Sequence, residues 1–356
     1  MRSTKTEDGS VLDSVGNVIV FSTERFIRDI CLGECCFLCG ANPESKTFND
    51  EHVLPEWLLR YCGLFDSEII LPNEGRIRYD RYKVPCCAEC NKLMGELLEQ
   101  PISDAMKGGY AHLSDWIVNG GNFKVFVWMA LIFFKTHLRD RTHRLHLDAR
   151  RGSEKISDEY DWELLHHLHS LVRCFHTNCF IDAKAMGSFL IVPVMVSDLL
   201  DRFDFGDLFQ PQTMLMRLND IGIVTVFDDA SGALTLYADF LKKITRPVSE
   251  IQLREIMVDL AWLNLHLKVR PTFATECDLI GEKCRLVVER PPQVELVELN
   301  HRLRGELLYG AVRHLLPKVP LLRRSYEEGV ELVKSGNLSF LRDDRGQFIE
   351  ESWKPL

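Results

Sequence analysis

The stretch CCAECN, residues 86–91, decides the fold of the N-terminal third of the chain. Cys87 and Cys90 stand in C-x-x-C spacing, and an earlier pair, Cys36 and Cys39, has the same spacing in CFLCG. A C-x-x-C turn points two thiolates in one direction, and two such turns supply the four ligands of a tetrahedral zinc site. The two pairs therefore predict a structural Zn²⁺ held by all four cysteines.

Three alternatives stay open for these pairs. Cys35 and Cys86 directly precede the preferred cysteines and would give pairs with three intervening residues, so the register is ambiguous. We favour the C-x-x-C register because it gives the standard zinc knuckle. A redox role is the second alternative, although such a motif needs only one pair in a βαβ setting. Two reduced pairs without a metal are the third.

The composition is that of an ordinary globular protein. The chain has 356 residues, a formal net charge of -9 and 12 cysteines. The acidic balance gives no global hint of nucleic-acid binding, although a local basic patch can coexist with it. The polar N-terminus predicts no signal peptide, and the longest apolar run, 125–134, is shorter than a membrane span and predicts a buried helix. We therefore expect a cytoplasmic protein with reduced thiols and no membrane association.

The sequence predicts an α+β protein in three parts. These are an N-terminal extension (1–30), a turn-rich cysteine module (31–115) and a larger α+β domain (120–356) without a recognisable motif. A regulatory or targeting role is the expectation for this last domain, from architecture alone. Periodicity and capping residues predict helices over 122–137, 158–178, 249–268, 293–315 and 325–335. Alternating or continuous apolar runs predict strands over 188–196, 213–218, 221–227 and 233–240.

Between the two cysteine pairs lies NDEHVLPEW, residues 49–57, in which an acid precedes a histidine and a proline follows. The order C-x-x-C, acid-His-x-x-Pro, C-x-x-C-Asn resembles the HNH endonuclease family in its zinc-knuckle form. The residues that carry the resemblance are Cys36, Cys39, Glu51, His52, Pro55, Cys87, Cys90 and Asn91. The resemblance implies a ββα-metal module, in which the zinc clamps a β-hairpin and Asn91 lies at the start of the helix.

The resemblance also implies a reaction, the metal-dependent hydrolysis of phosphodiester bonds, with DNA as the expected substrate and RNA as an open alternative. His52 would be the general base, and Glu51 and Asn91 would hold a catalytic divalent ion. Hard oxygen ligands suit Mg²⁺ or Mn²⁺. A histidine can activate water at neutral pH, and a divalent ion relieves charge at the phosphate. Adjacent strand residues face opposite sides, so a distorted strand end would be needed to bring Glu51 and His52 to one site.

The match to the family is incomplete. An asparagine that orients the histidine in many members is absent from RYDRYKVP, residues 78–85. Backbone carbonyls, Asp80 or Tyr82 are the candidates for that role. Lys92 is the only candidate for a displaced family lysine. The alternative function is therefore a catalytically inactive zinc module that binds nucleic acid or protein. Family members serve in restriction and phage defence, among other roles, which makes defence one expectation for the pathway.

Two further features each have a plain and a functional interpretation. The basic segment Lys135–Arg151 could follow a phosphate backbone, or it could be a solvated helix end and loop. His166 and His169 are three residues apart on one helix face and could bind a metal, but no third ligand is placed with them. For both features the plain interpretation is favoured.

Overall fold

The computed structural model describes residues 3–196, 201–278, 283–318 and 325–350. The chain is α+β, as predicted, and divides into two compact units. Unit 1 contains Met1–Lys107, Gly120–Ala185 and Phe273–Val288, and unit 2 contains Gly108–Asn119, Met186–Thr272 and Glu289–Leu356. This grouping differs from the contiguous division expected near residues 115–120, because segments distant in sequence pack with the cysteine module.

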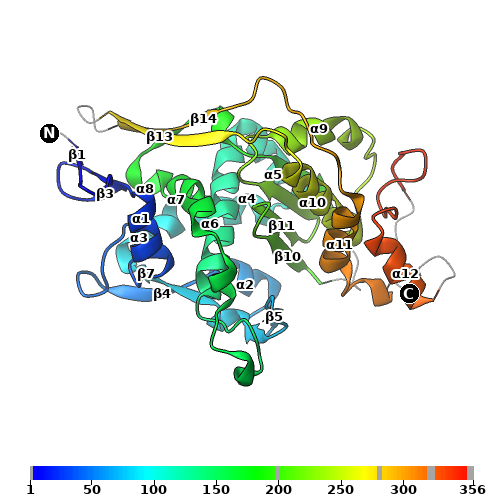
Figure 1. Cartoon of the computed structure of the whole chain (residues 1–356), viewed down its shortest axis with the longest axis horizontal. Coiled ribbons are helices and arrows are strands. Elements are labelled where there is room, and N and C mark those ends of the chain that lie inside the picture. The colour runs from blue at the N-terminus through cyan, green and yellow to red at the C-terminus, as the bar shows by residue number, and fades with distance from the viewer. Residues whose placement is uncertain (1–2, 197–200, 279–282, 319–324, 351–356) are drawn as a thin grey trace. The chain divides into compact units, whose positions relative to one another are not determined.

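Unit 1 is built around a short hairpin and a long buried helix (Figure 1). Its strands are β1 (Thr4–Lys5), β2 (Val11–Leu12), β3 (Val18–Val20), β4 (Phe48–His52), β5 (Glu68–Ile70), β6 (Arg76–Arg78), β7 (Lys83–Cys87), β8 (Phe180–Ile181), β13 (Thr272–Asp278) and β14 (Lys283–Glu289). Its α-helices are α1 (Thr23–Arg25), α2 (Glu56–Cys62), α3 (Ala88–Met94), α4 (Gln100–Lys107), α6 (Asn122–Asp140), α7 (His166–Val172) and α8 (Cys174–Thr177). π-helical segments η1 (Phe26–Cys31) and η3 (Gly95–Glu99) extend α1 and α3.

The hairpin that carries the site consists of β4 and β7. The two strands are antiparallel, with Phe48 opposite Cys87 and His52 opposite Lys83. The helix α3 begins directly after β7, so strand, strand and helix follow one another around the cysteine pair. The connection between the strands contains α2 and the small β5–β6 ribbon.

The long helix α6 forms the core of unit 1. Every residue from 125 to 134 is buried, which confirms the prediction of a buried helix over this apolar run. Among the described residues, one helical stretch, Gly109–Asp140, is long and apolar enough to cross a membrane, and 61% of its most apolar window is buried inside the protein. A core helix passes the same test, so this length and composition are weak evidence for a membrane span.

The predicted helix over 158–178 is wrong as a single element. The chain forms the 3₁₀ turns η6 (Ile156–Glu159) and η7 (Trp162–Leu165), followed by α7 and α8. The break comes at Tyr160 and Asp161, which have extended backbone, and the Asp161 carboxylate accepts the N–H of Glu163 to start η7. A local side-chain cap therefore overrides the longer apolar period.

The expectation that all twelve cysteines are free thiols is also wrong. Cys277 and Cys284 form a disulfide between the neighbouring strands β13 and β14, with their Cα atoms 4.3 Å apart. The sequence analysis did not predict these strands, so it could not place the two cysteines opposite each other. The other ten cysteines form no disulfide.

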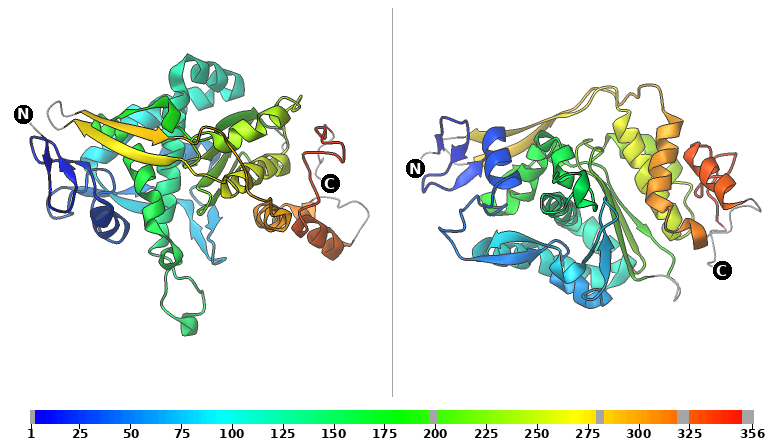
Figure 2. Two further views of the ribbon diagram at one scale, coloured as in Figure 1. Left: turned by 45° about the horizontal axis from the view of Figure 1, so that its top comes forward. Right: turned by 60° about the horizontal axis from the view of Figure 1, so that its bottom comes forward.

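Unit 2 has an antiparallel four-stranded sheet, ordered β10-β11-β12-β9, with helices packed on it. Its elements are α5 (Gly109–Trp116), β9 (Phe189–Pro193), β10 (Phe203–Leu208), β11 (Thr213–Leu218), β12 (Ile221–Val226), α9 (Gly232–Leu241), α10 (Glu250–Leu265), α11 (His301–Val312) and α12 (Tyr326–Lys334). Figure 2 shows α10 against the sheet, α11 beside α10, and α12 outermost.

Most predicted elements of this region are confirmed, although β10 was missed. Ser249 caps α10 as predicted, because its hydroxyl accepts the N–H of Gln252. The strand predicted over 233–240 is wrong, since these residues belong to α9. The Asp229 carboxylate accepts the N–H groups of Ser231 and Ala233, and so satisfies donors at the start of this helix.

Candidate functional site: a four-cysteine cluster and its hairpin

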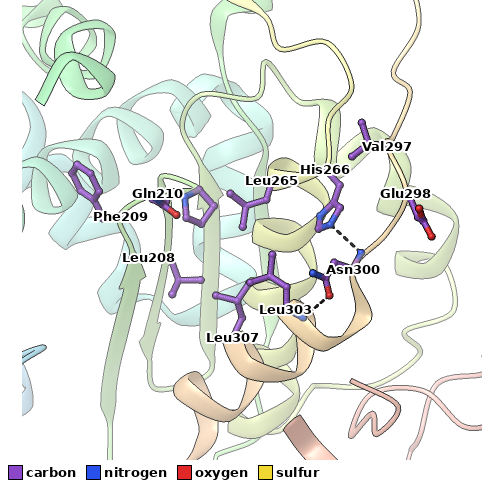
Figure 3. Close-up of a pocket in the computed structure, with 11 residues that line it drawn as sticks. Leu208, Phe209, Gln210, Leu265, His266, Val297, Glu298, Asn300, Leu303 and Leu307 are labelled. Atoms are coloured by element: carbon purple, nitrogen blue, oxygen red, sulfur yellow. Dashed lines mark hydrogen bonds between the residues drawn. The ribbon is translucent and has the colours of Figure 1, made fainter. Parts of the chain in front are cut away.

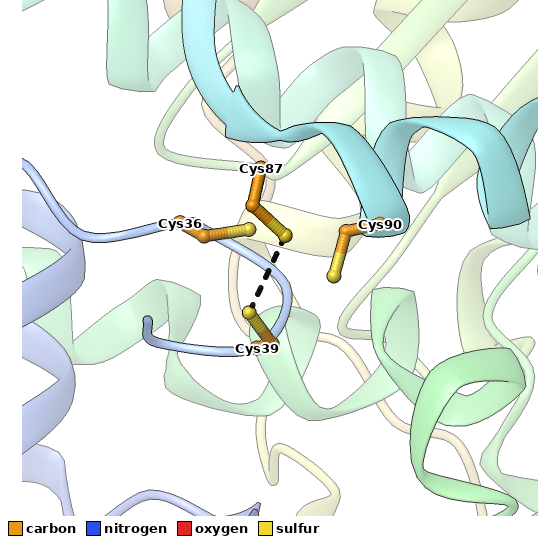
Figure 4. A group of neighbouring side chains, drawn as sticks. All are labelled: Cys36, Cys39, Cys87 and Cys90. Carbon is orange, nitrogen blue, oxygen red and sulfur yellow. Dashed lines mark hydrogen bonds between the residues drawn. The ribbon is translucent and has the colours of Figure 1, made fainter. Parts of the chain in front are cut away.

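Four cysteine sulfurs meet where the first cysteine turn faces the junction of β7 and α3 (Figure 4). The Sγ atoms of Cys36, Cys39, Cys87 and Cys90 all lie within 4.8 Å of one another, and those of Cys39 and Cys87 are 3.7 Å apart. This is the predicted set. Cys35 lies outside it.

Local backbone geometry explains why each pair converges. Gly40 has φ +74°, a left-handed conformation that glycine adopts without strain, and its N–H donates to the carbonyl of Cys36 at 2.8 Å. A Cβ at this position would lie 2.5 Å from the Phe21 ring. In the second pair, Cys87 ends β7 and is the N-cap of α3, and Cys90 lies within the first turn of that helix.

The thiols of this cluster influence one another strongly. S–H donation from Cys39, Cys86 and Cys90 lowers the pKa of Cys36. Donation to Cys36 in turn raises the pKa of Cys39 to about 12, and the pKa of Cys90 is raised chiefly by its hydrogen bond to Cys36. Ionisation of one thiol in this cluster therefore makes ionisation of a second thiol less favourable. A bound Zn²⁺ reverses this balance because coordination to the ion stabilises each thiolate, which is the chemistry of a four-thiolate zinc site.

Two buried side chains of unit 1 form hydrogen bonds with backbone carbonyls of the first cysteine turn. The Arg173 guanidinium donates to the carbonyls of Leu38, Ile19 and Val18, at 3.0 Å to Ile19 and 2.6 Å to Val18. His169 Nε2 lies 2.8 Å from the carbonyl of Phe37. Sequence reasoning missed these supports, and His169 is accounted for by this packing role instead of by metal binding.

His52 lies at the end of β4 and is half-buried. Its ring makes an edge contact with Phe65 at a centroid distance of 6.4 Å. Burial, followed by the positive charge of Lys83, lowers the pKa of His52 below its usual 6.5. The imidazole is therefore neutral near pH 7, which is the state that accepts a proton.

The two side chains that could orient His52, those of Asp80 and Tyr82, form hydrogen bonds with other residues. The Asp80 carboxylate accepts two hydrogen bonds from the Arg78 guanidinium, at 3.0 and 2.9 Å. The Tyr82 hydroxyl lies 3.5 Å from the carbonyl of Thr136. The hydrogen bonds described for both residues therefore go elsewhere.

Glu51 is buried and forms an ion pair with Lys135. Its Oε1 accepts a hydrogen bond from Lys135 Nζ at 2.7 Å, and the same ammonium donates to the carbonyl of His52 at 2.7 Å. The Lys135 side chain is 0% exposed and that of Glu51 is 9% exposed. Sequence reasoning missed Lys135 as a partner, although a lone lysine inside an apolar helical run is a signal, because a buried ammonium requires one.

A second carboxyl group lies close to this pair. Glu99 Oε1 is buried and has no hydrogen-bond partner among the described residues. Burial raises the pKa of Glu99 to about 7, with Glu51 and Glu56 adding to the shift and Lys135 opposing it. Asn91 is half-buried in α3, on the helix that begins at the cysteine cluster. Lys135 is hydrogen-bonded to Glu51, and the raised pKa of Glu99 favours the protonated form of this second carboxyl group.

Unit 2 contains a further side-chain cluster and a pocket, and several polar groups of both are used in bonds within the fold. Asp204, Glu250 and His314 in unit 2 come close enough to bind a metal, but Arg254 and Arg217 already pair with the two acids. Unit 2 also has a pocket of about 490 Å³, whose lining combines apolar side chains with Gln210, His266, Glu298 and Asn300 (Figure 3). The His266 ring lies 2.7 Å from the carbonyl of Trp262, and Nε2 accepts the N–H of Asn300, so its hydrogen bonds are used within the fold.

No family model, curated protein or solved structure matches the chain. The geometry by itself is compatible with a structural zinc at the four cysteines. The same hairpin places a neutral histidine at one strand end and a buried carboxylate on the adjacent residue.

Proposed function

We propose that the protein is an HNH-like endonuclease that hydrolyses phosphodiester bonds in DNA, with His52 as the general base. The observation that carries the proposal is the position of His52. It is a neutral, half-buried histidine at the end of a strand whose partner strand runs directly into the four-cysteine cluster. A histidine with this protonation state can take a proton from water at neutral pH.

Each part of the hairpin has a role in this proposal. The cysteine cluster ties the start of α3 to the first cysteine turn, and so supports the β7 strand that pairs with β4. Lys135 donates to the carbonyl of His52 and thereby positions the backbone of the base. A base on a fixed backbone loses less entropy in reaching a reactive geometry.

A divalent ion, Mg²⁺ or Mn²⁺, would be held by Glu51 and Asn91, as the resemblance implies. It would supply charge relief at the phosphate. Glu99 would be a further ligand candidate, because its buried Oε1 has no hydrogen-bond partner among the described residues. Glu51 would have to offer the ion its oxygen that is not bonded to Lys135.

The second candidate is a zinc module without catalytic activity, which binds nucleic acid or protein. The Glu51–Lys135 ion pair favours it, because an acid that is already neutralised has less affinity for a metal ion. Strand alternation also directs Glu51 and His52 to opposite faces of the hairpin.

The test is nicking of supercoiled plasmid by purified protein with Mg²⁺ or Mn²⁺. The parent should cut, and His52→Ala should not, while its zinc content and circular dichroism match the parent. A matched control is His146→Ala, which removes an imidazole from the segment after α6 that has no role in the proposal. If His52→Ala cuts as fast as the parent, His52 is not the base. If the parent itself does not cut, the zinc module without catalytic activity is the better description.

A further inference from the structure

We propose that a positively charged pocket in unit 1 binds a phosphate group of the nucleic-acid backbone. The pocket has a volume of about 310 Å³. It is lined by Asp50, Asp80, Arg81, Lys83, Val84, Pro85 and Arg139. This inference rests on the proposed nuclease function and adds to it a substrate contact, which α6 supplies from outside the cysteine module.

The pairing of β4 with β7 relates the pocket to His52. Asp50 lies opposite Pro85, and His52 lies opposite Lys83. Directly opposed residues of an antiparallel pair share a face, and so do residues two apart along one strand. Asp50, Pro85 and Lys83 therefore lie on the face of the hairpin that carries His52. A phosphate held in this pocket would therefore lie on the same face of the hairpin as a phosphodiester presented to His52.

The charges in the pocket favour an anion. Arg81, Lys83 and Arg139 are cations. Of the two acids, Asp80 is neutralised by Arg78, which bonds both carboxylate oxygens. Asp50 is exposed and is the single remaining acid of the lining. Three cations against one unneutralised acid leave a net positive charge.

Arg139 has an unmet hydrogen-bonding need. Its Nε is buried and has no hydrogen-bond partner among the described residues. Burial also lowers the pKa of Arg139, which reflects an under-compensated charge. A buried N–H without an acceptor costs free energy, and a phosphate oxygen would satisfy it. The planar guanidinium fork also matches the geometry of phosphate oxygens better than an ammonium does.

Three other cations of the basic segment 135–151 are committed to partners. Lys135 binds Glu51, Arg141 donates to the backbone carbonyl of Gly33 and pairs with Glu34, and Arg150 pairs with Asp148. The segment therefore does not act as a continuous basic track. Arg139 is the cation of this segment that lines the pocket.

The experiment measures binding separately from cleavage. The full chain with His52→Ala is titrated against a short fluorescein-labelled DNA duplex, and anisotropy is recorded over a series of salt concentrations. Adding Arg139→Gln should weaken binding on the order of ten-fold and reduce the slope of log K against log salt by about 1. Arg81→Gln should act in the same direction. Arg150→Gln, the matched control, should leave both quantities unchanged.

The outcomes separate the pocket from the catalytic proposal. If the parent nicks plasmid but Arg139→Gln and Arg81→Gln bind like the Arg150→Gln control, the pocket is overturned and the nuclease stands. If the parent does not nick but Arg139→Gln loses binding, the pocket stands without the nuclease. Absence of any DNA binding overturns both. Competition by inorganic phosphate at concentrations equal to those of DNA phosphate would show that the pocket recognises the free ion and overturn the backbone assignment.

Discussion

Replacing Lys135 by Met should destabilise unit 1 by about 3–5 kcal/mol, the usual cost of removing one partner from a buried ion pair. The ammonium is fully buried and lies 2.7 Å from both Glu51 Oε1 and the carbonyl of His52. At this distance, two unit charges in a medium of effective dielectric constant 20 attract by about 6 kcal/mol before desolvation is counted. Methionine keeps the apolar stem but leaves the Glu51 carboxylate buried without its counter-ion.

The assay is urea denaturation, with release of zinc to a chromogenic chelator as the signal for unit 1. Glu51→Gln combined with Lys135→Met should recover a large part of the loss, because neither position of the former ion pair then carries a charge. The control is Lys92→Met, which breaks an exposed pair with Glu96 and should change stability by less than about 0.5 kcal/mol. A Lys135→Met variant as stable as the control would refute this account of the core.

Three more outcomes follow from the site. Arg173→Met should speed zinc loss to a chelator by at least about ten-fold, because the carbonyl of Leu38 in the first cysteine turn and those of Val18 and Ile19 in β3 lose a charged donor. Zinc loss at the rate of the parent would contradict that support. Nicking should fall on acidification with a midpoint below 6.5, because the pKa of His52 is lowered, and Lys83→Met should move the midpoint upward in the pH–rate profile. Glu51→Gln and Asn91→Ala should raise the Mg²⁺ concentration needed for half-maximal nicking, and an unchanged titration in both would place the ion elsewhere.

The features that could be predicted from the sequence depend on local geometry. C-x-x-C spacing determines how two thiols of one turn converge, so the set Cys36, Cys39, Cys87 and Cys90 could be predicted without a fold. The buried run of α6 could be predicted because ten consecutive apolar residues have no other place in a folded protein. Ser249 is likewise a local cap signal.

The features that could not be predicted depend on distant partners. Glu51 and Lys135 are 84 residues apart, and no local pattern pairs them. The run 233–240 fits both strand and helix periods, and the Asp229 side chain, which lies before it, favours the helix. Residues 120–185 pack with the cysteine module because of tertiary contacts, which a change of composition along the chain does not reveal.

The central claim, that four thiolates clamp the hairpin carrying His52, is tested most directly by native mass spectrometry of the full chain purified under reducing conditions. The account predicts one zinc per chain, retained in Cys35→Ser and lost in Cys90→Ser, because Cys90 belongs to the four-sulfur cluster and Cys35 does not. A parent chain without zinc, or a Cys90→Ser variant that keeps its zinc while Cys35→Ser loses it, would contradict the account.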